Sequence, residues 1–202
     1  MPNENSQTFV FFGVGGSGKG TQVKLLTDFL KSRDGRETIY IGTGEIFRKI
    51  VESSESNFDT RAVKELMHSG RLIPDEMTNK LVAEAVESNL SPNKHMIFDG
   101  YPRTVFQSEK FTDLVKSIKR ENIKIIYIEL SEEEAMKRNL LRGRKDDTRE
   151  GLSKRFEEYK NNVIPAMNYF KNKDNYQIFT INGEQSIENV HKDIINKLGY
   201  SL

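Results

Sequence analysis

A glycine-rich segment, Gly13-Val-Gly-Gly-Ser-Gly-Lys-Gly-Thr21, stands between an apolar run at Thr8–Phe12 and a helical pattern of apolar residues. Glycines give the backbone conformations closed to other residues, so several N–H groups can approach one anion. The positive end of the following helix and the Lys19 ammonium add to this attraction. The context predicts a phosphate-binding loop that holds a nucleotide, rather than a plain glycine-rich turn. The residues expected to bind the triphosphate are Gly16, Ser17, Gly18, Lys19, Gly20 and Thr21.

Length and composition narrow the classes of protein. The 202 residues suit one α/β domain, 1–202, with small inserts. A net charge of +1 gives no sign of a nucleic-acid or membrane partner, and the absence of cysteine excludes disulfides and thiolate-bound zinc. The polar N-terminus is unlike a signal peptide, and no apolar run approaches the ~20 residues of a membrane span. We therefore expect a cytoplasmic protein, which we take to be a monomer.

The order of elements predicts the fold class. Apolar, β-rich runs lie at Thr8–Phe12, Thr38–Ile41, His95–Phe98, Ile123–Leu130 and Tyr176–Ile181, separated by stretches long enough for helices. Strands that alternate with helices predict a three-layer αβα fold with a five-stranded parallel sheet. The fifty or so residues between the second and third strands exceed the needs of one crossover and predict a small helical insert.

Helix signals are clear in the second half of the chain. Ser131 followed by Glu134 is typical of a capping box, which predicts a helix that begins there. Two further helices are predicted, one from about Arg149 to Phe170 and one from about Ser186 to Leu198.

The Gly-Lys-Gly-Thr form of the loop resembles that of the adenylate kinases, and the resemblance covers nearly the whole chain. The matching segments are Ile41-Gly-Thr-Gly-Glu-Ile-Phe-Arg48, Gly70-Arg-Leu-Ile-Pro-Asp-Glu76, Phe98-Asp-Gly-Tyr-Pro-Arg-Thr-Val-Phe-Gln107 and Lys137-Arg-Asn-Leu-Leu-Arg-Gly-Arg-Lys-Asp-Asp147. The resemblance implies a P-loop kinase fold with a monophosphate-binding insert at 42–73 and a lid at 142–148.

The resemblance also implies roles for individual residues. Those expected to bind AMP are Thr43, Arg48, Arg71, Ile73, Gly100, Arg103, Gln107, Arg144 and Arg155. Those expected on the ATP side, besides the loop, are Arg138 against the base, Arg142 on the phosphates and Gly183 near the adenine. The catalytic set is Lys19, Arg103, Arg142, Arg144 and Arg155, because clustered cations suit charge that spreads over a transferred phosphoryl group.

Three acidic residues complete the expected site. Asp99 ends a predicted buried strand beside the loop, where a carboxylate can hold Mg²⁺ through water. Asp146 and Asp147 are expected to orient arginines by charge-assisted hydrogen bonds.

The sequence departs from the family pattern in two places. Only Gly143 separates Arg142 from Arg144, so the lid is reduced to a turn, which bears on how completely water is excluded. Val14-Gly15 stands where the family commonly has proline.

The expected function is reversible phosphoryl transfer from Mg-ATP to AMP, giving two ADP. Thr43, Thr104 and Gln107 favour AMP over UMP or CMP by family pattern. Two alternatives stay open: a kinase for another nucleoside monophosphate, and a nucleotide-binding regulatory protein with little turnover.

Overall fold

The computed structural model describes residues 6–53, 59–143 and 148–201. Its five parallel strands form one sheet in the order β2-β3-β1-β4-β5. The strands are β1 (Thr8–Phe12), β2 (Thr38–Gly42), β3 (His95–Asp99), β4 (Ile123–Glu129) and β5 (Tyr176–Asn182). All five predicted strands are confirmed, within one residue at each end.

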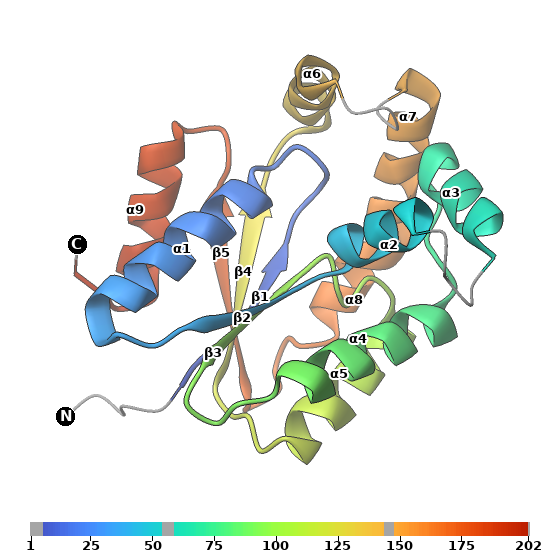
Figure 1. Cartoon of the computed structure of the whole chain (residues 1–202). Helices are drawn as coiled ribbons and strands as arrows, with labels where there is room; N and C mark the ends of the chain where they lie inside the picture. Colours follow the sequence, from blue (N-terminus) through green and yellow to red (C-terminus); the bar gives the residue numbers. More distant parts are fainter. Residues whose placement is uncertain (1–5, 54–58, 144–147, 202) are drawn as a thin grey trace.

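Helices cover both faces of the sheet, so the predicted three-layer fold is confirmed (Figure 1). One face carries α1 (Lys19–Asp34) and α9 (Ile187–Lys197), and the other carries α4 (Asp75–Asn89), α5 (Val105–Ser117) and α8 (Ile164–Asn168). None of the helices in the described parts of the chain is long and apolar enough to cross a membrane.

The central strand β1 is buried along its whole length. Phe9 and Phe11 pack toward α1 and α9, whereas Val10 and Phe12 pack toward α4, α5 and α8. A strand buried on both faces reads as a continuous apolar run, which is the pattern seen in the sequence. The loop that follows Phe12 is thereby held at the carboxyl edge of the sheet.

Two helices, α2 (Thr43–Glu52) and α3 (Thr60–Ser69), occupy the segment where an insert was expected. They contribute to a small apolar cluster built around Phe47, Val63 and Ile73, against which side chains of α4 also pack. At the end of α3, Gly70 has φ +76°, and a Cβ there would overlap the carbonyl oxygen of Gly151 in α7 (Arg149–Glu158). This glycine lets the insert pack closely against α7.

The helix predicted from about Arg149 to Phe170 is interrupted, which corrects the sequence prediction. A π-helical turn, η1 (Tyr159–Val163), separates α7 from α8, and the Ile164 N–H donates to the Tyr159 carbonyl five residues back. Pro165 has no N–H, and its ring crowds the carbonyl four residues earlier, so a wider turn in front of it relieves the α-helical ladder.

The predicted capping box at the start of α6 (Glu132–Arg142) is only half formed. Ser131 Oγ accepts from the Glu134 N–H at 3.4 Å, as a cap does. The Glu134 carboxylate does not return to the Ser131 N–H, because it accepts from Arg138 Nε at 2.8 Å. The Ser131 N–H instead donates to Glu184 at 3.3 Å. Arg138, one helical turn further along, therefore binds the carboxylate that a full capping box would need.

A buried histidine lies at the amino end of the sheet. His95 is fully buried; its Nδ1 accepts from the Gln7 N–H at 3.0 Å, and its Nε2 lies 3.1 Å from Asp34. These partners fit a neutral ring with the proton on Nε2. Burial lowers the pKa of His95, and Arg36 and Arg120 act in the same direction, whereas Asp34 opposes them.

We expect the free energy of unfolding to fall as pH drops below about 6.5, because the unfolded chain takes up a proton that folded His95 resists. His95→Gln should lower the slope of the unfolding free energy against pH by up to ~1.4 kcal/mol per pH unit. Urea unfolding between pH 7.5 and 5.5 measures the slope, with exposed His68→Gln as the control. Equal slopes in the two variants would contradict the assignment.

Candidate active site

The glycine-rich loop joins β1 to α1 and closes on its own lysine. Lys19 Nζ donates to the carbonyls of Gly13 at 2.6 Å and Val14 at 3.0 Å. Gly18, the N-cap of α1, has φ +91°, and Gly16 has φ +90°. A Cβ at Gly16 would lie 2.7 Å from Asn139 Nδ2, so the loop also needs glycine there to pack on α6. The loop therefore holds the Lys19 ammonium against the carbonyls of its own first two residues.

One predicted loop residue, Ser17, is not brought to the cavity surface. Its side chain is buried, and its Oγ has no hydrogen-bond partner within the described residues. Its N–H donates to the Val14 carbonyl at 3.1 Å. Ser17 thus helps to shape the turn of the loop in this structure.

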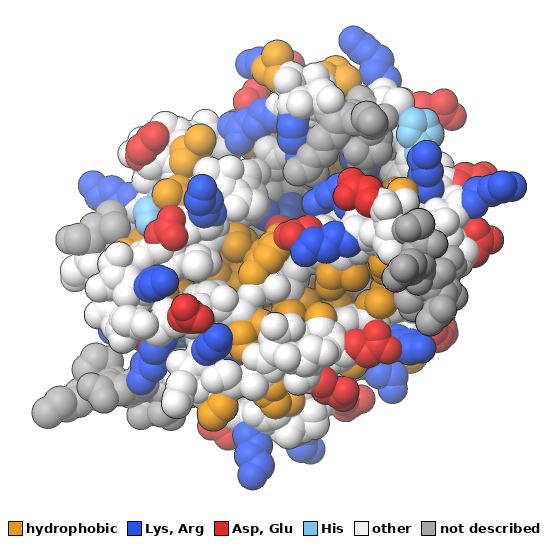
Figure 2. All heavy atoms as spheres, in the orientation of Figure 1, with side chains coloured by type: hydrophobic (Ala, Val, Ile, Leu, Met, Phe, Trp, Pro, Cys, Tyr) orange, Lys and Arg blue, Asp and Glu red, His pale blue; other side chains and the backbone are white. Residues whose placement is uncertain are grey.

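A cavity of about 730 Å³ opens at the carboxyl ends of the strands. Figure 2 shows this face hollowed at its centre, with hydrophobic side chains on the floor and Lys and Arg side chains toward the upper rim. The predicted residues that line the cavity are Gly16, Gly18, Lys19, Gly20, Thr21, Thr43, Arg48, Arg71, Ile73, Asp99, Gly100, Arg103, Gln107, Arg138, Arg142 and Arg155. Segments far apart in the sequence therefore meet around one space.

The Gly100 carbonyl organises the side of the cavity next to the insert. It accepts from Thr43 Oγ1 and from Arg103 Nε, both at 2.7 Å. Gly100 has φ +75°, and a Cβ there would lie 2.7 Å from Arg103 Nη2 and 2.9 Å from Thr43 Oγ1. A side chain at this position would displace both partners, so Gly100 sets where the Arg103 guanidinium lies.

Arg103 and Asp99 bring opposite charges to the cavity. Burial lowers the pKa of Arg103, and Asp99 opposes that effect. A guanidinium stays protonated in proteins, so Arg103 presents a partly desolvated cation, which interacts strongly with an anion.

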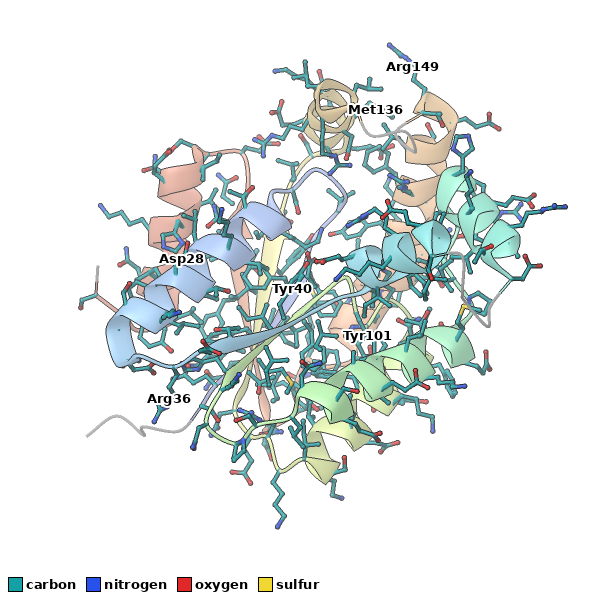
Figure 3. All side chains as sticks on the ribbon, viewed as in Figure 1. Asp28, Arg36, Tyr40, Tyr101, Met136 and Arg149 are labelled. Carbon is teal, nitrogen blue, oxygen red and sulfur yellow. The ribbon has the colours of Figure 1, made fainter. Side chains whose placement is uncertain are left out.

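Tyr40 on β2, near the middle of the view in Figure 3, donates to Asp99 Oδ2 at 3.2 Å. Burial and the Asp99 charge raise the pKa of Tyr40, so its hydroxyl keeps the proton that it donates. Asp99 offers a carboxylate to the cavity, but the described residues contain no group of three His, Cys, Asp or Glu that could hold a metal ion. A single carboxylate fits a Mg²⁺ ion that keeps several waters and binds substrate phosphates.

Three of the expected arginines come from the helices at the top of the view, α6, which carries Met136, and α7, which begins at Arg149 (Figure 3). Arg138 donates to the Gly183 carbonyl at 3.0 Å, which joins the two residues expected beside the adenine. Arg155 donates to the Met67 carbonyl of α3 at 3.1 Å. Arg144, Asp146 and Asp147, which are also expected at the site, lie outside the described residues.

Sequence reasoning gave no role to Asp75, the first residue of α4. Asp75 Oδ1 accepts from Gln107 Nε2 at 2.8 Å, and Oδ2 accepts from Thr104 Oγ1 at 2.9 Å. Gln107 Oε1 in turn accepts from the Arg103 N–H at 2.8 Å. Both ends of the Gln107 amide are therefore held. An acidic residue directly after a proline is typical of the first turn of an ordinary helix. The contact between Asp75 and Gln107 is therefore visible only in the fold.

The sheet order, the glycine-rich loop at the end of its central strand and the cationic cavity define a P-loop nucleotide-binding protein. A family model described as adenylate kinase matches residues 11–175. The chain belongs to the adenylate kinase family, which confirms the resemblance drawn from the motifs.

Curated relatives agree along nearly the full length. An adenylate kinase of Prochlorococcus marinus (strain MIT 9301) is 33% identical over 189 residues, covering 94% of this chain and 97% of that protein. One of Oenococcus oeni is 33% identical over 183 residues, covering 90% and 93%. One of Thermosipho africanus is 30% identical, covering 93% and 97%.

We expect Asp75→Ala to lower the free energy of unfolding by about 1–3 kcal/mol, because the buried Gln107 amide and the Thr104 hydroxyl lose a shared charged acceptor. Urea unfolding measures the loss. The exposed neighbour Glu76→Ala is the control, since it changes the same charge on the same helical turn. Equal unfolding midpoints for the two variants would show that the Asp75 contacts add nothing.

Proposed function

We propose that this member of the adenylate kinase family catalyses reversible phosphoryl transfer from Mg-ATP to AMP, giving two molecules of ADP. The observation that carries the proposal is the common cavity: Lys19, Arg103, Arg142 and Arg155, from four separate segments, all line it beside the glycine-rich loop. Two phosphate-bearing ends repel each other, and a converging set of cations offsets that repulsion. Family membership supports the same activity.

In the proposed arrangement, ATP lies on the loop at 15–21 and AMP lies beneath the insert at 42–73. The resemblance to the family supports a base beside Arg138 and Gly183, which are hydrogen-bonded to each other, on the ATP side. On the AMP side, Arg48, Arg71 and Arg103 line the cavity near Thr43 and Ile73. The lid is proposed to be the short segment 142–148, with Arg144 acting beside Arg142.

The proposed reaction needs alignment and charge stabilisation rather than a strong base. The AMP phosphate is already ionised near neutral pH, so its oxygen can attack the γ-phosphorus of ATP in line. The bond from the γ-phosphorus to the bridging oxygen breaks, and that oxygen leaves on the ADP formed from ATP. Lys19 follows the transferred group, while Arg142, Arg144 and Arg155 donate to its oxygens. Asp99 would hold Mg²⁺ through water, and the bound ion would neutralise charge on the triphosphate.

The proposed preference for AMP rests on Gln107 and Thr43. Gln107 carries an amide donor and an acceptor that suit a purine edge, once ligand binding competes with Asp75 for its amide. UMP and CMP are the alternative acceptors, and an ADP-formation assay over a panel of nucleoside monophosphates separates them. The same assay tests the regulatory alternative, because a protein with little turnover forms little ADP. We also propose that the protein acts in the cytoplasm and as a monomer.

Lys19→Met is expected to lower kcat at least 100-fold, because methionine keeps the length of the side chain and removes the cation. A coupled ADP-formation assay measures turnover, and circular dichroism checks that the fold is intact. Lys31→Met, an exposed lysine on the same helix, is the control and is expected to keep its turnover. Turnover of Lys19→Met near that of Lys31→Met would remove Lys19 from the mechanism.

Gln107→Ala is expected to lower the ratio of kcat/KM for AMP over UMP by about tenfold, because a buried amide that pairs with the base discriminates by roughly 1–2 kcal/mol. The measurement is the ratio itself, since a general loss of positioning lowers both values together. Glu109→Ala, at an exposed site on α5, is the control. An unchanged ratio would refute the base assignment.

A further inference from the structure

A buried asparagine stands between the phosphate loop and a cationic side chain of the cavity. Asn139 lies on the inner side of α6, and its side chain is fully buried. Its Nδ2 donates to the Gly15 carbonyl of the loop at 2.7 Å and to the Ala135 carbonyl at 2.8 Å. Its Oδ1 accepts from Arg142 Nη2 at 2.6 Å. The Asn139 side chain therefore contacts both the phosphate loop and the Arg142 guanidinium.

The chemistry of these partners fixes the orientation of the amide. Two carbonyl oxygens face one end of the Asn139 side chain, and only an NH₂ group can donate to both. A guanidinium faces the other end, which must therefore be the carbonyl oxygen. A flipped amide would place its oxygen against the two carbonyl oxygens and its NH₂ group against the guanidinium. The side chain therefore has a single favourable orientation.

Packing around Asn139 reinforces the link. A Cβ at Gly16 would lie 2.7 Å from Asn139 Nδ2 and 2.9 Å from the Ala135 carbonyl, so the loop backbone rests directly on α6. Beside it, Val14 of the loop packs with Ala135, Leu152 and Phe156 in one apolar cluster. The loop therefore packs directly on α6 at Ala135 and Asn139. A shift of the loop or of α6 would disturb these contacts.

We propose that Asn139 is a positioning residue that couples the phosphate loop to the Arg142 guanidinium, so that a triphosphate seated on the loop also sets Arg142 for transfer. This inference rests on the proposed function, which supplies the triphosphate. Asn139 itself does not line the cavity. It acts through the two groups that do the binding.

A double-mutant cycle tests the coupling through activity. Asn139→Leu, which has nearly the same size and no polar groups, is expected to lower kcat at least tenfold and to change the KM for AMP less than twofold. In an Arg142→Ala background the same change is expected to lower kcat less than twofold, because the group that it positions is gone. Equal losses in both backgrounds, or no loss in either, would overturn the proposal.

Hydrogen exchange tests the coupling without turnover. In the ligand-free protein, Asn139→Leu is expected to raise amide exchange at least threefold both in the loop and in the last turn of α6, because the two lose their common contact. Asn189→Leu, an exposed asparagine on α9, is the control and is expected to change neither segment. Faster exchange in α6 alone, with the loop unchanged, would overturn the proposal.

Adding a non-hydrolysable ATP analogue separates the two proposals. In the unmodified protein the analogue is expected to slow exchange in the loop and in the last turn of α6, whereas in Asn139→Leu it should slow exchange in the loop only. Protection of both segments in both proteins would refute the coupling. Binding of the analogue without any ADP formation from ATP and AMP would instead refute the proposed function, and the ligand-free comparison would still decide the role of Asn139.

Discussion

Burial of β1 on both faces determines where the chemistry of this protein can take place. Phe9 and Phe11 fill one layer and Val10 and Phe12 the other, which fits the place of β1 at the centre of the strand order. In a parallel sheet every strand ends at the same edge, and the loop after the central strand lies between the ends of its neighbours, β3 and β4. Asp99 therefore comes to the loop from one side, and α6 with its arginines comes from the other.

Cations that converge on one cavity repel each other, and within the described residues several of them are oriented by backbone carbonyls. Lys19 donates to two carbonyls of its own loop, and Arg103 donates to that of Gly100. Arg138 and Arg155 donate to the carbonyls of Gly183 and Met67. A carbonyl orients a cation without cancelling its formal charge, so these cations keep their charge for an anionic ligand. This suits a chain whose net charge is only +1 and whose anion site must be local.

Much of the fold and many of the site residues could be predicted, because their signals are local. The strands are apolar runs, and the loop is a run of glycines at a strand end. Asn139 and Asp75 could not be found this way, since their roles come from contacts with residues 124 and 32 positions away. The prediction of a full capping box was wrong for a related reason. Arg138 competes for the Glu134 carboxylate, and a local sequence pattern does not show which of two partners that carboxylate takes. The turn at 159–163 had a local signal in Pro165, which the apolar periodicity on either side obscured.

The two helices that flank the segment proposed as the lid each bond to a different side of the cavity. Asn139 of α6 bonds the loop on which the triphosphate is proposed to lie, whereas Arg155 of α7 bonds α3 of the insert proposed to cover AMP. Gly70 lets α3 approach α7 so closely that a methyl group would not fit between them. Only residues 143–148 join α6 to α7. If this segment is the lid, as we propose, the two helices beside it link the loop proposed to hold the triphosphate with the insert proposed to cover AMP.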